Sequence, residues 1–111
     1  MITKEHVNQL IKDFINNLNI RDNNFFILFS IHSKIIYESM EITNNSIIDF
    51  WSNFNYKLNV IKYDINIVGD RRANILLSGK IDENKNFSMY ILLAIDNHKK
   101  YWIHSLILQI F

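Results

Sequence analysis

The residues of this sequence that could perform acid–base chemistry are few. His104 lies in the last apolar stretch, where strict alternation places it on the inward face together with Trp102 and Leu106. Tyr63 or Asp64, in an earlier alternating stretch, could meet this histidine as an acid–base partner for proton transfer. A single histidine on an apolar face is more often a hydrogen-bonded core residue. We therefore expect no catalytic residue and keep this acid–base group as the alternative.

Motifs for metal binding, cofactor binding and covalent catalysis are missing from the sequence. His6, His32 and His98 lack a metal-ligand spacing such as His-Glu-x-x-His. The chain contains no cysteine, which removes disulfides, thiolate zinc sites and cysteine nucleophiles. It has neither a glycine-rich phosphate loop nor a Gly-x-Ser-x-Gly turn. We predict no metal, no cofactor and no enzymatic activity.

The composition predicts one soluble globular domain over residues 1–111. Apolar residues make up 49% of the chain and aromatic residues 14%, which is enough for a well-filled core. The net charge is only +1, and the best basic cluster, Arg71 with Arg72, is too small to hold nucleic-acid phosphates. The longest apolar runs, 25–29 and 91–95, are too short to cross a membrane. We expect neither nucleic acid nor membrane as a direct partner.

Two stretches have the periodicity of amphipathic helices. Apolar residues recur every three or four positions from Val7 to Leu18, and Thr3 is a suitable N-cap, so a helix is predicted over 4–19. The same spacing from Ile47 to Phe54 predicts a second helix over 46–54. The apolar block 25–31 fits a strand or a buried helical turn, and periodicity does not decide between them. Two short extended segments are expected at 34–39 and 40–43.

The second half of the chain reads as consecutive strands. Two apolar neighbours, Val60 and Ile61, indicate a β-bulge in the first of them. The turns are too short for parallel crossovers, so neighbouring strands must be antiparallel. The fold class is therefore α+β, with the helices on one face of a meander. The predicted strands are 56–68, 73–82, 87–96 and 101–110.

The outward face of this meander is unusually apolar. A sheet covered by helices on one side normally exposes polar residues on the other, yet the last strands are apolar at both parities. Exposing several large side chains would cost several kcal/mol at ~25 cal/mol per Å². We predict a sheet-to-sheet interface with a partner chain; the alternative is that the first long strand or the C-terminus covers this face. The predicted interface residues are Leu76, Tyr90, Leu92, Ile103 and Ile107.

Three features follow one another along the chain: the stretch Tyr37-Glu38-Ser39, the helical segment 46–54, and Gly79 late in a strand. They resemble the Trp-Glu-Gly stretch, the middle helix and the glycine late in the fourth strand of the nuclear transport factor 2-like family. The segments 87–93 and 101–110 are similar to its last two strands. The resemblance covers nearly the whole chain. It implies a cone-shaped fold, with an N-terminal helix and a second helix packed on a curved antiparallel sheet.

The resemblance also implies a function in nucleocytoplasmic transport. The favoured interpretation is that the protein is the small subunit that pairs through its sheet with a large mRNA export receptor and supports binding to nuclear-pore FG repeats. The first alternative is a homodimeric carrier of Ran-GDP into the nucleus; the second is an isomerase or dehydratase that uses the cone cavity. Localisation would be the nucleus, the nuclear pore and the cytoplasm. Glu38, Asp82 and Glu83 are the predicted additional partner contacts.

Overall fold

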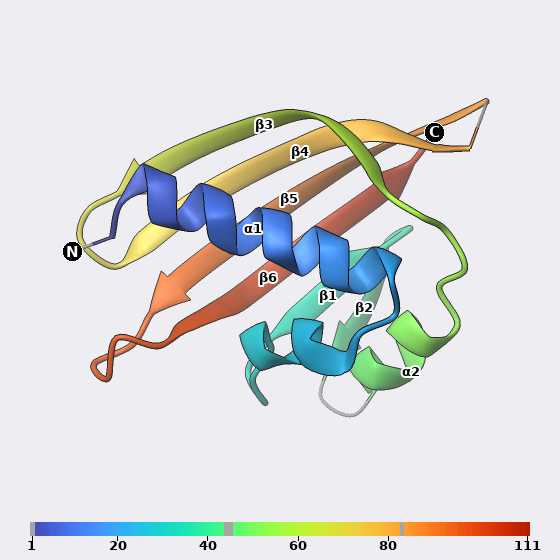
Figure 1. The fold of residues 1–111 in the computed structure, drawn as a ribbon. Helices are drawn as coiled ribbons and strands as arrows, with labels where there is room; N and C mark the ends of the chain where they lie inside the picture. Colours follow the sequence, from blue (N-terminus) through green and yellow to red (C-terminus); the bar gives the residue numbers. More distant parts are fainter. Residues whose placement is uncertain (1, 44–45, 83) are drawn as a thin grey trace.

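The computed structural model describes residues 2–43, 46–82 and 84–111 (Figure 1). Both predicted helices and all six predicted extended segments are confirmed, with ends shifted by a few residues. The undecided block after the first helix forms a 3₁₀ helix, η1. The elements are α1 (Lys4–Asn19), η1 (Asn23–Leu28), β1 (Lys34–Tyr37), β2 (Met40–Thr43), α2 (Ser46–Ser52), β3 (Asn59–Val68), β4 (Arg72–Asp82), β5 (Lys85–Ile95) and β6 (Tyr101–Ile110).

The strands form one curved sheet in the order β2-β1-β6-β5-β4-β3. The strands β3 to β6 make the predicted antiparallel meander. The expectation of a wholly antiparallel sheet is wrong, because β1 pairs in parallel with β6, with Ile35 opposite Leu106. Parallel neighbours need a long connection, and here α2 and the rest of the meander lie between the two strands in sequence. The sheet is therefore mixed.

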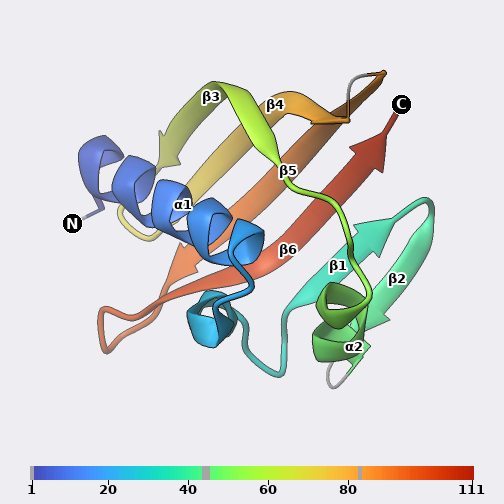
Figure 2. The ribbon, with the colours of Figure 1, turned by 45° about the vertical axis from the view of Figure 1, so that its right-hand side comes forward.

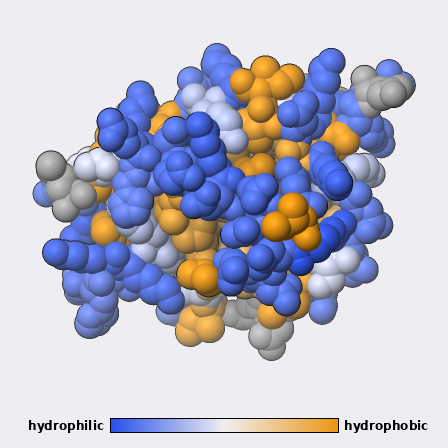
Figure 3. Space-filling view, in the orientation of Figure 1, coloured by the Kyte–Doolittle hydropathy of each residue, from blue (hydrophilic) through white to orange (hydrophobic). Residues whose placement is uncertain are grey.

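The helices cover the concave face of this sheet (Figure 2). The Oγ1 of Thr3 accepts a hydrogen bond from the backbone N–H of His6 at 3.3 Å, which confirms the predicted N-cap of α1. The side chain of Asn19 then makes two 2.8 Å hydrogen bonds with the backbone of Leu58, so the end of α1 is tied to the entry of β3. The outward side of α1 is mainly hydrophilic (Figure 3). None of the described helices combines the length and apolar character needed to cross a membrane.

Aromatic rings hold α2 against the rest of the molecule. Trp51, 3% exposed, lies with its ring centroid 6.1 Å from that of Phe25 and 5.2 Å from that of Phe54. Phe50 reaches the ring of Tyr37 in β1 at 5.3 Å. The helix has only seven residues, too few to be stable alone. Its position therefore depends on these contacts.

The space between helices and sheet is filled by apolar side chains. The inward residues of the five strands β1, β3, β4, β5 and β6 and the buried side of α1 belong to one hydrophobic core. None of those that are almost completely buried carries a titratable group. They are Ile35, Ala73, Ile75, Leu77, Phe87, Met89, Ile91, Leu93, Ile103, Leu106 and Leu108, each at most 1% exposed.

The sheet bends sharply where β3 meets Gly79 of β4. The register shifts between Val60 and Lys62, which confirms the predicted bulge, and the extra residue Ile61 is 67% exposed. A Cβ atom on Gly79 would lie 1.9 Å from the carbonyl oxygen of Asn59. Two strands can approach this closely only if the position carries no side chain.

Gly79→Ala is therefore expected to destabilise the fold. The added methyl group would force the bulged backbone of β3 away from β4, at a cost of about 1–3 kcal/mol, the usual range for overpacking. Urea unfolding followed by circular dichroism measures this loss. The neighbouring exposed substitution Lys80→Ala should change the free energy of unfolding by less than about 0.5 kcal/mol. Equal stability of the two variants would contradict the close approach.

Candidate functional site: the outer face of the sheet

The convex side of the sheet, which we call the outer face, carries a row of large apolar side chains. The strand register places Leu76 beside Tyr90, and Tyr90 beside Ile107, across β4, β5 and β6. Leu92 lies two residues further along β5 on the same face. Leu76 is 43% exposed, and the other three are partly exposed. The outward placement predicted for these four residues is therefore what the structure shows.

The placement predicted for Ile103 is wrong. Leu92 pairs with Ser105, whereas Leu93 pairs with Ile103, so His104 is an extra residue in β6. This bulge reverses the alternation before it. Ile103 turns into the core, where it is 0% exposed, while Trp102 lies opposite Ala94 on the outer face. We therefore define the outer patch as Leu76, Tyr90, Leu92, Trp102 and Ile107.

The same bulge separates the residues of the acid–base alternative. His104 was expected on the inward face, but it is exposed and lines a hollow on the outer face. Tyr63 faces α1, with the Nζ of Lys12 5.8 Å from its ring centroid, and its burial raises its pKa. Asp64 points outward and forms an ion pair with Lys62 at 3.6 Å. Two strands lie between β3 and β6, a separation of about 14 Å at ~4.8 Å per strand. These three residues do not form one site.

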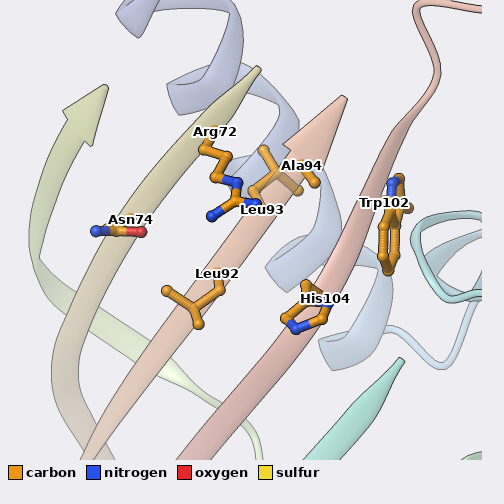
Figure 4. Close-up of a pocket in the computed structure, with 7 residues that line it drawn as sticks. All are labelled: Arg72, Asn74, Leu92, Leu93, Ala94, Trp102 and His104. Carbon is orange, nitrogen blue, oxygen red and sulfur yellow. The ribbon is translucent and has the colours of Figure 1, made fainter. Parts of the chain in front are cut away.

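A hollow of about 170 Å³ lies at one end of the outer patch. Figure 4 views it with the helices behind the sheet: the Arg72 guanidinium extends from β4 over β5, and Trp102 and His104 stand on β6. The Trp102 and His104 rings meet edge to face with centroids 5.5 Å apart. The hollow thus combines one cation, one imidazole and an indole with apolar walls. Its lining residues are Arg72, Asn74, Leu92, Leu93, Ala94, Trp102 and His104.

Residue spacing alone does not predict Arg72, Trp102 and His104 as members of this face. Arg72 falls in the turn predicted before the strand 73–82, whereas it is the first residue of β4. For Trp102 and His104 the cause is that β6 is apolar on both sides, so simple alternation fits either register. One signal was available: His104 and Ser105 are consecutive polar residues inside a mainly apolar strand. Such a pair interrupts the alternation, as an inserted residue does.

The predicted partner contacts lie at one end of the sheet. Glu38 is exposed in the β1–β2 turn, where it and Ser39 have φ values of 49° and 68°. Asp82 is exposed at the end of β4. Because β1 and β4 run in the same direction, Glu38 and Asp82 lie at the same end of the sheet (Figure 2). Glu83 lies outside the described residues. Whether Glu38 and Asp82 touch a partner stays a prediction.

An apolar groove of about 420 Å³ opens between α2 and the β1–β2 hairpin. Tyr37, Phe50, Phe54 and Tyr56 supply aromatic walls, and Met40 forms an exposed edge. Burial, and then the nearby Glu38 carboxylate, raise the pKa of Tyr37, so its hydroxyl stays neutral at physiological pH. The groove can hold an apolar side chain near the acidic residue of the β1–β2 turn.

The β5–β6 turn that leads to Trp102 is held by Asp96. Its Oδ1 accepts hydrogen bonds from the backbone N–H groups of His98 at 2.8 Å and Lys100 at 2.9 Å. These hydrogen bonds lower the pKa of Asp96 below its ordinary value, and the one from Lys100 has the largest effect. Asp96, Lys100 and Trp102 also line a second hollow of about 310 Å³ beside η1. No group of His, Asp and Glu suited to a metal ion occurs among residues 2–43, 46–82 and 84–111.

No protein-family model matches the sequence, and no curated protein matches it significantly. Solved structures do match. Nuclear transport factor 2 of Cryptosporidium parvum superposes with a TM-score of 0.79 at 12% identity, over 94% of this chain and 90% of that one. The chain has the nuclear transport factor 2-like fold. The predicted fold class is thus confirmed, with the parallel β1–β6 pair as the exception to its antiparallel sheet.

Other proteins with the nuclear transport factor 2-like fold are equally similar in sequence. A putative ketosteroid isomerase of Parabacteroides distasonis has a TM-score of 0.72 at 12% identity, over 96% of this chain and 86% of that one. A protein of unknown function from Shewanella baltica has a TM-score of 0.70 at 15% identity, over 100% and 98%. One fold supports many activities, so function depends on the surfaces described above.

The bulge in β6 predicts costs of very different size for the same substitution at two isoleucines of one strand. Ile103→Ala should cost about 2–5 kcal/mol, as expected for a cavity in the core. Ile107→Ala, on the outer face, should cost about 1 kcal/mol or less in the isolated chain. Urea unfolding of both variants measures the difference. Strict alternation without the bulge would place both side chains on the same face, so similar costs for the two variants would contradict the bulge.

Asp96→Asn should lower the melting temperature at neutral pH, because the amide is a weaker acceptor for the turn. In the folded protein the pKa of Asp96 is below its ordinary 3.8. The ionised carboxylate therefore contributes fully to stability above pH 3.8, and this contribution is lost as the pH falls through the lowered pKa. The melting-temperature gap between wild type and variant should therefore close in acid. Asp70→Asn, in the β3–β4 turn, is the matched control and should show no such gap.

Proposed function

We propose that this protein is a non-catalytic adaptor in nucleocytoplasmic transport. In this proposal it is the small subunit that pairs through its outer face with a large mRNA export receptor and supports the binding of nuclear-pore FG repeats. The observation that carries the proposal is the outer patch, which the described chain leaves open. The protein would act in the nucleus, at the nuclear pore and in the cytoplasm.

The outer patch has the anatomy of a protein interface. Its centre is apolar and aromatic, with Leu76, Tyr90 and Trp102 partly exposed. Charged pairs lie at the two margins: Lys62 with Asp64 on β3, and Lys34 with Glu41 on β1 and β2, each at 3.6 Å. An apolar centre with a polar rim is typical of protein–protein contacts. Contiguous apolar surface of this kind on a monomer commonly marks a binding site.

A non-catalytic role agrees with the filled interior. The most deeply buried inward side chains are all apolar, and His104 faces outward. An enzyme that used the cone would need polar groups that converge there. The isomerase or dehydratase alternative therefore has less support than the adaptor.

The carrier of Ran-GDP is the second candidate. It is favoured by the apolar groove beside Tyr37 and by the acidic residues Glu38 and Asp82 at the same end of the sheet. The Nζ of Lys85 lies 5.8 Å from the centroid of the Tyr56 ring at this end, which reduces the acidic character of the surface. For this reason we rank the carrier below the adaptor.

Affinity capture of the tagged chain from its native cell tests the proposal. The wild type should bring down a large partner, identified by mass spectrometry, and Ile107→Asp and Leu76→Asp should lose it because each places a charge in the outer patch. Ile48→Asp, at an exposed position of α2, is the matched control and should retain the partner. Circular dichroism checks that each variant is folded.

The carrier alternative gives a different result in the same experiment. It predicts a stable homodimer that binds purified Ran-GDP and loses this binding on Glu38→Lys. A partner that resists both outer-patch substitutions in folded protein would overturn the proposed interface.

A further inference from the structure

We infer that the hollow between Arg72 and His104 anchors a carboxylate side chain of a different protein whose surface covers the outer patch. The inference rests on the proposed function and adds the chemistry of the partner: an acidic residue flanked by apolar ones. It also distinguishes a foreign partner from a second copy of this chain.

Arg72 is the cation that this acid would meet. Among the described residues no carboxylate lies within 4 Å of its guanidinium; the ion pairs found there join Lys34 to Glu41 and Lys62 to Asp64. Its neighbour Arg71 is engaged differently, donating a hydrogen bond from its guanidinium to the side-chain oxygen of Asn97. Arg72 instead lines the hollow and extends over β5 (Figure 4). A guanidinium presents a fork of donors that matches a carboxylate.

The walls of the hollow would strengthen this contact. Leu92 and Ala94 form an apolar floor between Arg72 and the rings of β6 (Figure 4). Its volume of about 170 Å³ is several times the ~30 Å³ share of one water molecule, so a side chain can enter. A partner that covers Trp102 would exclude water from the ion pair, and lower polarity makes such a pair stronger.

A second copy of the chain is a poor source of the acid. The acids placed on the outer face by the strand register, Asp64 and Glu41, belong to the edge strands β3 and β2. Each already has a lysine at 3.6 Å. The more central strands contribute Arg72, His104 and Lys80 instead. Stacking two identical faces would therefore bury the Arg72 guanidinium without a free carboxylate from these strands, and an unpaired buried charge is costly.

Two matched peptides test the anchor without knowledge of the natural partner. The probes are acetyl-Leu-Asp-Leu-amide and acetyl-Leu-Asn-Leu-amide, titrated into ¹⁵N-labelled protein at a concentration where sedimentation shows a monomer. The aspartate peptide should shift the side-chain N–H signals of Arg72 and Trp102 and saturate. The asparagine peptide should bind about tenfold more weakly or not at all, because it lacks the charge-assisted hydrogen bond.

Two arginine variants of equal charge provide the control. Arg72→Gln should abolish the preference for aspartate, whereas Arg71→Gln should keep it, although both remove one positive charge. Equal response to the two peptides, no localised shift, or equal loss in both folded variants would overturn the anchor. The peptide titration and the partner capture can fail separately. If the titration disproves the anchor while the capture still finds a partner that Ile107→Asp removes, the proposed interface stands and only the prediction of a carboxylate in the hollow is wrong.

Discussion

The structure depends on extra residues that bend its sheet. Register shifts interrupt the β3–β4, β4–β5 and β5–β6 pairs, and bulges of this kind increase twist and curvature. At the first of them Gly79 admits the backbone of Asn59 at a distance no other residue would allow. Bending gives the sheet a concave side that α1 can fill and a convex side that no described helix covers.

The bulge in β6 connects this bending to function. By inserting His104, the strand sends Ile103 into the core and Trp102 outward. The core gains an aliphatic side chain at the centre of the sheet. The outer face gains an indole and an imidazole beside Arg72. A single inserted residue thus changes both sides of the sheet, and the outer face acquires two further groups with directional preferences.

Much of this architecture could be predicted from residue spacing. The helix α1 and the four-stranded meander follow from periodicity and short turns, and the bulge at Val60 and Ile61 was visible as two adjacent apolar residues. The prediction that Ile103 lies on the outer face is wrong because β6 is apolar at both parities. Alternation therefore carries no information about the register of this strand. The parallel partner of β1 could not be predicted, since a four-residue strand has too few positions to specify a neighbour. The hollow depends on side chains from three strands and became visible only in the structure.

The pairing of β1 with β6 has a consequence for how the molecule folds. The hydroxyl of Ser33, the residue before β1, donates a hydrogen bond to the carbonyl oxygen of Ile103, which lies 70 positions later in the chain. Contacts between such distant segments close large loops and slow folding. During synthesis β1 can pair with β2 but not with β6 until β6 has left the ribosome. Because β6 also carries Trp102 and Ile107, the surface offered to a partner is completed in the same late step. The chain therefore presents this surface only after its core has closed.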